Sequence, residues 1–278
     1  MPRLLLSFLC LFTITACASI ERIAIPKSNL ADSSFQSAGK VTKVDHRAWG
    51  KFLKANTVKD NADIVRVKYA DISPAQKQQL KDYIKSLSST DHTKLSKDAQ
   101  LAYWANLYNA QTVDVILDNY PVESIRKIKD RPFDLGPWED KRLTVNGKEL
   151  SLHDIEHGIV RPLWSNEPRI HYILNCAAAG CPNLGQKAYT GQNIQQSLHD
   201  AAIAYVNDPR GVTVSANGRI IASKIYSWYK DDFGGSNEAI LNHIRKYADD
   251  DLKAALRGKK RIAKYEYDWS LNDATATP

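Results

Sequence analysis

The chain has 278 residues, of which 43% are hydrophobic and 25% charged, and this composition excludes a disordered or fibrous protein. The net charge is +7, but Lys and Arg are spread along the chain without a DNA- or RNA-binding motif, so nucleic acid is not an expected partner. After the first sixteen residues, no apolar run is long enough for a transmembrane helix.

The first sixteen residues have the pattern of a secretory signal. Arg3 provides a positive start, and the apolar stretch at 4–15 is too short to span a membrane. The sequence ITAC at 14–17 resembles the lipobox of bacterial lipoproteins, which implies cleavage before Cys17 and lipid attachment to it. Ala18 is not the aspartate that retains lipoproteins in the inner membrane, so we expect an outer-membrane anchor facing the periplasm.

A plain cleaved signal that ends near Ala18 and leaves Cys17 free is the alternative. In either case we expect four regions along the chain. These are a signal peptide at 1–16, Cys17 with a flexible linker at 17–42, a single domain at 43–272 and a disordered tail at 273–278.

Periodic patterns predict mainly helices in the first half of the domain. Ser73 and Pro74 have the cap and first-turn residues of a helix, and Tyr120-Pro121 ends the longest helical pattern. The expected helices cover 45–56, 73–87 and 96–119, and a strand is expected at 64–69.

The second half mixes hairpins and helices. Asn146-Gly147 and Asn217-Gly218 predict the turns of two hairpins. The other expected elements are helices at 151–161, 192–207, 238–248 and 251–256, and strands at 169–175 and 262–267. This order predicts an α+β single domain, with helices and antiparallel hairpins around a small sheet.

His153, Glu156 and His157 spell H-x-x-E-H, the inverted zinc-peptidase signature. Two histidines four residues apart share a helix face and could both reach one metal ion. Ser151 and Asp154 also fit a capping box, which would place His153 in the first turn, partly in solvent. A zinc hydrolase therefore stays one hypothesis, with its third ligand not located.

Cys176 and Cys181 are the thiols left once Cys10 departs with the signal and Cys17 is lipidated. They could form a disulfide worth roughly 2 kcal/mol in the chain-entropy model, provide a thiolate nucleophile served by a histidine, or stay buried and inert. His171 and Cys176 would face opposite sides of an unbroken strand, so their pairing requires the chain to turn.

Other polar residues could complete such a site. His157, on the preceding predicted helix, is an equally good base, and Glu156 or an asparagine could orient an imidazole. Asn106 and Asn109 lie among aromatic residues of the longest predicted helix, although asparagine prefers helix caps. They are expected either in a buried hydrogen-bond network or at a binding site, unless one of them faces water.

Five segments together resemble the DUF547 family, a domain of unknown function, over about residues 65–272; they are 102–109, 150–161, 169–184, 223–233 and 267–272. The resemblance implies that Glu156 and His157 form the functional pair, since the position of His153 is usually not histidine. It also implies a shared thiol at Cys176, whereas the position of Cys181 varies more.

We therefore expect a cysteine-dependent hydrolase or acyl/amide transferase, in which Cys176 attacks a carbonyl group. His157 or His171 would be the base, and Glu156 or Asn106 would orient it.

The alternative is a non-catalytic envelope binding module with a Cys176–Cys181 disulfide, and the second alternative is the zinc hydrolase. No cofactor is expected. The expected partners are the membrane, through lipid on Cys17, and a peptide or small-molecule ligand.

Overall fold

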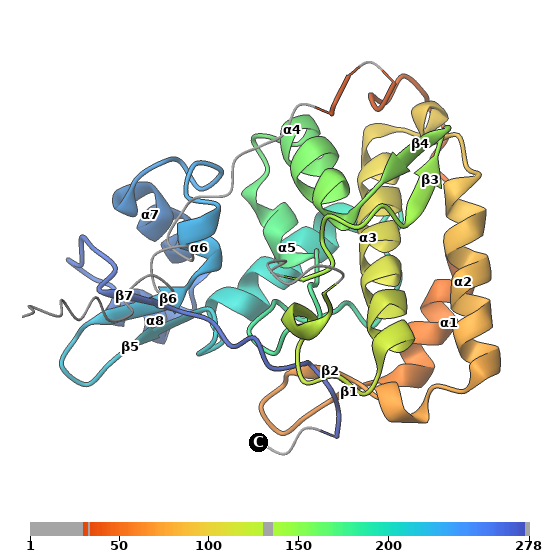
Figure 1. Cartoon of the computed structure of the whole chain (residues 1–278). Coiled ribbons are helices and arrows are strands. Elements are labelled where there is room, and N and C mark those ends of the chain that lie inside the picture. Colours follow the sequence, from red (N-terminus) through yellow and green to blue (C-terminus); the bar gives the residue numbers. More distant parts are fainter. Residues whose placement is uncertain (1–29, 33, 130–135, 276–278) are drawn as a thin grey trace, which may run out of the picture.

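The structure is a computed structural model and describes residues 30–32, 34–129 and 136–275 (Figure 1). The predicted signal peptide, Cys17 and the first part of the predicted linker lie outside the described residues. The described part is an α+β domain, as predicted, with helices and three small sheets. None of its helices combines the length and the apolar character needed to cross a membrane.

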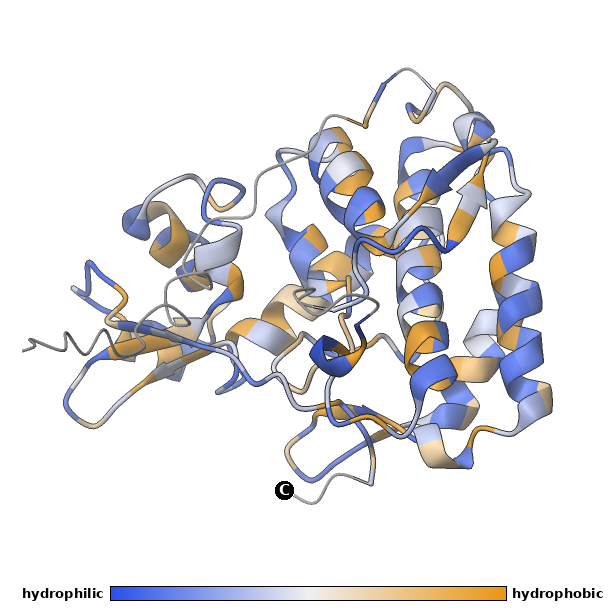
Figure 2. Cartoon of the chain, viewed as in Figure 1, coloured by the Kyte–Doolittle hydropathy of each residue, from blue (hydrophilic) through white to orange (hydrophobic). Residues whose placement is uncertain are grey.

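The first half is built on the long helix α3 (Lys97–Asn119), which lies between α2 (Pro74–Ser88) and α5 (Ile194–Val206) (Figure 1). Every residue of α3 from 99 to 116 is buried, as expected of a central helix covered on all sides. Figure 2 shows hydrophilic as well as hydrophobic residues along it. Its buried polar side chains must therefore find partners inside the protein. The remaining helix of this half is α1 (Arg47–Asn56).

The second half contains the largest sheet, of order β5 (Val212–Val214), β6 (Ile220–Ser223) and β7 (Lys264–Glu266). β5 and β6 form the predicted hairpin, whereas β7 pairs with β6 in parallel, which the sequence pattern did not indicate. A second apolar cluster forms here beside the main core. The helices of this half are α6 (Ile225–Trp228), α7 (Asn237–Tyr247) and α8 (Asp250–Ala255).

Two further hairpins complete the sheets. β3 (Leu143–Val145) and β4 (Lys148–Leu150) pair as predicted around Asn146 and Gly147, whose φ angles are 50° and 75°. Both positive values are what a type I′ turn requires, which is why Asn-Gly was a reliable signal. β2 (Val65–Val67) pairs with β1 (Thr57–Lys59), a strand that was not predicted.

The strand predicted at 169–175 is wrong. Residues Pro168–Tyr172 form a 3-10 helix, η6, followed by irregular chain. Pro168 fixes its own φ at a helical value, and the Glu167 side chain accepts from the Arg169 N–H to cap the turn. The apolar run that suggested a strand is buried as part of a 3-10 helix and the irregular chain after it. Hydrophobic periodicity alone cannot distinguish a short buried strand from a short buried helix.

The helix predicted at 151–161 is present but wound differently. It is a π-helix, η5 (Asp154–Val160), that continues into α4 (Arg161–Leu163). The predicted capping box is confirmed, because Ser151 N–H donates to Asp154 Oδ2 at 2.7 Å and Asp154 N–H donates to Ser151 Oγ at 3.1 Å. π-helical turns are rare and occur frequently at functional sites.

The packed chain extends beyond both predicted domain boundaries. Phe35, within the predicted linker, is buried and stacks on His92 with ring centroids 5.7 Å apart. At the other end Tyr120 donates its hydroxyl to Asp273 at 2.8 Å, within the predicted tail. Residues 276–278 lie outside the described part of the chain.

Candidate active site

A loop from Asn175 to Pro182 carries both cysteines, and a buried asparagine of α3 fixes its start. Asn109 donates to the Ile173 carbonyl at 2.8 Å and accepts from the Asn175 N–H at 2.8 Å. Asn175 in turn donates to the Pro182 carbonyl at 2.8 Å and accepts from the Ala177 N–H at 2.9 Å. Asparagine side chains thus provide the hydrogen bonds that backbone groups of this loop would otherwise find in a helix or sheet.

Asn106, one turn earlier in α3, fixes another backbone segment in the same way, through both ends of its side-chain amide. Its amide donates to the Tyr189 carbonyl at 2.8 Å and accepts from the Tyr189 N–H at 3.1 Å. Both asparagines were expected either in a buried hydrogen-bond network or at a binding site. In the structure Asn106 and Asn109 hold backbone, and we assign no ligand contact to either.

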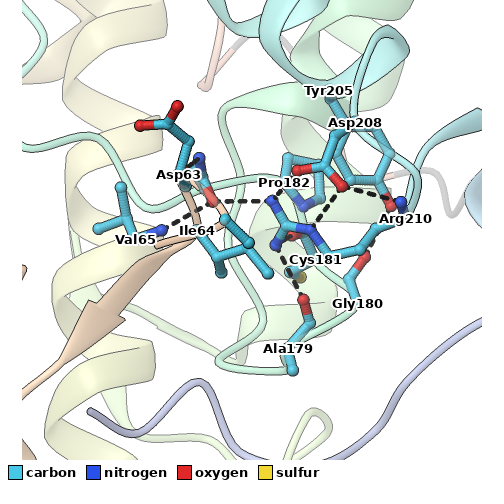
Figure 3. Close-up of polar contacts among 12 residues, drawn as sticks. Asp63, Ile64, Val65, Ala179, Gly180, Cys181, Pro182, Tyr205, Asp208 and Arg210 are labelled. Carbon is cyan, nitrogen blue, oxygen red and sulfur yellow. Dashed lines mark hydrogen bonds and ion pairs between the residues drawn. The ribbon is translucent and has the colours of Figure 1, made fainter. Parts of the chain in front are cut away.

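Arg210 binds backbone carbonyls of the cysteine loop (Figure 3). Its guanidinium donates to the carbonyls of Ala179 and Cys181 at 2.9 and 3.1 Å, and to Asp208 at 2.6 Å. The planar group with five fixed donors suits this role, because it bridges several acceptors at once.

Gly180 makes the closest backbone approach of the loop. Its N–H donates to the Asp268 carbonyl at 2.9 Å, and its own carbonyl accepts from the Tyr205 hydroxyl at 2.6 Å. A Cβ atom at Gly180 would lie 2.6 Å from the Asp268 nitrogen, so only glycine fits without moving backbone. The loop is therefore fixed from several sides.

Within this loop the two sulfur atoms share a hydrogen-bonded cluster with Tyr267. The Cys176 N–H donates to Cys181 Sγ at 3.0 Å, and the Tyr267 hydroxyl lies 3.1 Å from each sulfur. Both cysteines are free thiols in the structure. Cys176 is partly exposed, whereas Cys181 is only 3% exposed.

The two thiols differ in acidity. Burial alone would raise the pKa of Cys181, but hydrogen bonds from the Cys176 thiol, Tyr267 and the N–H groups of Cys176 and Ala178 outweigh it, so that pKa is lowered. The pKa of Cys176 is raised, because its thiol donates to Cys181 and is desolvated. The first negative charge of the pair is therefore held mainly on Cys181.

Glu156 lies in a second polar cluster, formed by η5, α3 and the segment after α6. It is buried and accepts from the Tyr108 hydroxyl at 2.8 Å and from the Tyr229 hydroxyl at 2.7 Å. Burial opposes its ionisation, but the imidazoles of His157 and His171 and the two hydroxyls outweigh burial, so the pKa of Glu156 is lowered. Glu156 is thus a buried carboxylate bonded to tyrosines.

His157 faces Arg161 one turn along the same helix. The Arg161 Nη1 lies 3.2 Å from His157 Nδ1, and since arginine can only donate, that nitrogen is the acceptor. Burial lowers the pKa of His157 to about 3. The His153 ring meets it edge-on at 4.5 Å. Among the residues that the structure describes, His, Cys, Asp and Glu side chains form no group of three that could hold a metal ion.

His171 pairs with Asp232, a residue not singled out from the sequence. His171 Nε2 lies 2.9 Å from Asp232 Oδ2, and Arg161 donates to the same oxygen at 2.6 Å. The ring stacks on Tyr229 with centroids 3.8 Å apart. Burial lowers the pKa of His171 despite the carboxylate, and its buried Nδ1 has no hydrogen-bond partner among the described residues.

The cysteine loop and the polar cluster around Glu156 lie beside each other. Cys176 lies close enough to Tyr108 and Tyr229 to raise the pKa of both, so the two clusters are neighbours. No sulfur bonds to an imidazole in the described part of the chain. The hydrogen-bond partners of Cys176 are Cys181 and Tyr267, where His157 or His171 was expected. Glu156 likewise bonds to tyrosines and to neither imidazole.

Sequence reasoning missed Arg161, Tyr229, Asp232 and Tyr267. All four lie in segments that carried the family resemblance. The signal that could have found the last three of them is the presence of both aspartates and tyrosines in the segments 223–233 and 267–272. Nothing in their spacing indicates which histidine or cysteine each would contact.

Comparison with known families gives a match to part of the chain. Residues 92–206 match the DUF547 family, described as a protein of unknown function. This part of the chain is similar to a DUF547 domain. The match spans α3, η5, the cysteine loop and α5, whereas Tyr229, Asp232 and Tyr267 lie beyond it. Comparisons with curated proteins and with solved structures gave no match.

Proposed function

We propose that this protein is a lipid-anchored protein of the bacterial envelope whose DUF547-like domain is a cysteine-dependent hydrolase or acyl transferase. Cys176 is the nucleophile. The observation that supports it most is the cluster of Cys176, Cys181 and Tyr267, in which a partly exposed thiol donates to a partner that stabilises negative charge. A thiolate is the nucleophilic form of cysteine, and Cys181, which stabilises negative charge, can take the proton of Cys176 as that thiol attacks.

The chemistry needs no contact between sulfur and imidazole. As Cys176 attacks the carbonyl carbon of an acyl substrate, its S–H bond breaks and the proton passes to the Cys181 thiolate. The bond to the leaving group then breaks, and that group takes the proton back from Cys181. Water or another nucleophile attacks the thioester, releases the acyl group and restores the Cys176 thiol.

A cavity of about 500 Å³ beside this cluster supports a peptide or small molecule as substrate. Its lining includes Tyr267 of the cluster and the neighbouring Gly180, and its charged groups are Arg210, Lys224, Glu266 and Asp268. Two cations and two anions suit a ligand that carries both charges, such as a short peptide with free termini. The buried pair of His171 and Asp232 is assigned no step.

The test is acylation by an activated ester. The reduced full chain is mixed with p-nitrophenyl acetate, and peptide mass analysis locates the acetyl group. We expect a burst of p-nitrophenolate with acetyl on Cys176, lost in Cys176→Ser and slowed in the matched Cys181→Ser. Equal release by wild type and Cys176→Ser, or acetyl found only on lysines, would contradict the proposal.

The second candidate is a non-catalytic binding module. It is favoured by one observation: the polar atoms of Asn106, Asn109 and Glu156 are all engaged in internal bonds, as in a scaffold. For such a module the ester experiment would give no adduct at Cys176, while the chain stays folded.

A further inference from the structure

We infer that Cys176 and Cys181 also form a reversible dithiol–disulfide couple, in which Cys176 is the sulfur that exchanges with small external thiols. This second activity concerns the same loop as the proposed function, but it involves sulfur exchange and no acyl group. It can therefore hold or fail independently of acyl transfer.

The two sulfurs are already neighbours. The Cys176 thiol hydrogen-bonds Cys181, and the backbone N–H of Cys176 reaches Cys181 Sγ at 3.0 Å. Tyr267 contacts both sulfurs at 3.1 Å, so one hydroxyl spans the pair. Oxidation would join two atoms that the anchored loop already holds together, with no distant segment to bring in.

The pair is asymmetric in access. Cys176 is partly exposed and Cys181 is buried, so an incoming thiolate reaches the Cys176 sulfur first. The cavity of about 500 Å³ lined by Gly180 and Tyr267 has room for a small thiol. Small thiols of the cysteine or glutathione class are therefore the expected co-reactants.

The pair is also asymmetric as a leaving group. Cys181 Sγ accepts from the N–H of Cys176 and from the Tyr267 hydroxyl, which stabilises the thiolate released when the disulfide opens. In thiol–disulfide exchange the thiol of lower pKa departs faster. Access and leaving ability therefore favour the same direction of attack.

The reaction has two steps. An external thiolate attacks the Cys176 sulfur, the new S–S bond forms, and the bond to Cys181 breaks with its electron pair left on Cys181. A second thiolate then attacks the external sulfur, which frees Cys176 to take a proton. Two external thiols are oxidised to their disulfide, and the protein disulfide gains two electrons.

The test uses the purified full chain in buffers of graded reduced and oxidised glutathione, read by intact mass and by peptide mapping that separates Cys17 from the pair. We expect a reversible loss of two hydrogens located to Cys176–Cys181. Cys181→Ser should trap glutathione on Cys176, whereas Cys176→Ser should leave Cys181 at least about tenfold less modified, because a buried thiol is poorly accessible. Circular dichroism confirms that both variants fold.

Equal modification of the two variants, preferential modification of Cys181, or no internal disulfide at any ratio would each overturn the inference. The ester experiment is run in excess reductant, where no disulfide persists. A chain that forms the couple but no acetyl adduct would contradict acyl transfer alone, and the converse result would contradict the couple alone.

Discussion

Tyr267 joins the two sulfurs at the scale of single residues. Its hydroxyl lies 3.1 Å from each, and it lowers the pKa of both thiols by hydrogen bonding. A hydrogen bond to a charged group contributes about 1.5–3 kcal/mol. One hydroxyl therefore has a measurable share in thiolate formation.

Tyr267→Phe removes that hydroxyl and keeps the ring. We expect iodoacetamide to label Cys176 about tenfold more slowly at neutral pH, since 1.4 kcal/mol corresponds to one pKa unit. The matched control is Tyr265→Phe, because the Tyr265 hydroxyl bonds to the exposed Asn237 at 3.3 Å and not to either sulfur. Identical labelling rates in both variants would show that Tyr267 is a packing residue.

At the scale of elements, α3 and the cysteine loop are held together by amide side chains. Asn109→Ala would leave the Ile173 carbonyl and the Asn175 N–H without their partners in a buried site. We expect a loss of about 2–4 kcal/mol in the free energy of unfolding, measured with urea.

The control for that change is Asn242→Ala, an exposed asparagine in α7. A surface substitution of this kind is expected to stay within about 0.5 kcal/mol of wild type. A similar small effect at Asn109 would mean that the loop keeps its shape without the helix.

The elements with strong local signals were predictable from the sequence, and those set by packing were not. Ser73-Pro74 and Asn146-Gly147 fixed their helix start and turn through their own backbone preferences. The segment 168–172 has no such signal, and its apolar side chains fit a strand and a buried 3-10 turn equally well.

The site shows the same division. Residue types correctly drew attention to Glu156, Cys176 and Cys181, because carboxylates and thiols in those settings are chemically notable. Their partners Tyr229 and Tyr267 are more than 70 residues away from Glu156 and Cys176 along the chain, so only the fold could reveal them.

At the scale of the whole molecule, burial of histidines couples folding to pH. Burial lowers the pKa of His157 to about 3 and the pKa values of His46, His92 and His243 to about 4, against 6.5 when unfolded. Between pH 4 and pH 6.5 the unfolded chain therefore binds more protons than the folded chain. Their stabilisation is complete above 6.5 and is lost as the pH falls toward 4.

We expect the free energy of unfolding to drop between pH 7 and pH 5 by up to about 1.4 kcal/mol per pH unit for each such histidine. Urea titrations at several pH values measure the slope. His92→Gln should reduce it, and His199→Gln, at an exposed position, controls for the loss of an imidazole. A flat profile in wild type would refute this account of the buried rings.

The proposed anchor is a second whole-molecule property. If lipid on Cys17 holds the chain in the envelope, Cys17→Ser should move it from the membrane fraction to the soluble fraction of the expressing bacterium. Labelling with a palmitate analogue should be lost with it. A chain that stays in the membrane fraction after the substitution is held there by something else.

The most direct test of a reactive Cys176 compares its alkylation in the folded and unfolded states. The rate constant for iodoacetamide at Cys176 is measured by peptide mass for the reduced full chain in neutral buffer and in concentrated urea. If Cys181 accepts the proton of Cys176 during attack, the folded chain reacts faster than the unfolded one, even though folding raises the pKa of the Cys176 thiol. A Cys176 that reacts more slowly in the folded chain would contradict the nucleophile on which the proposed function depends.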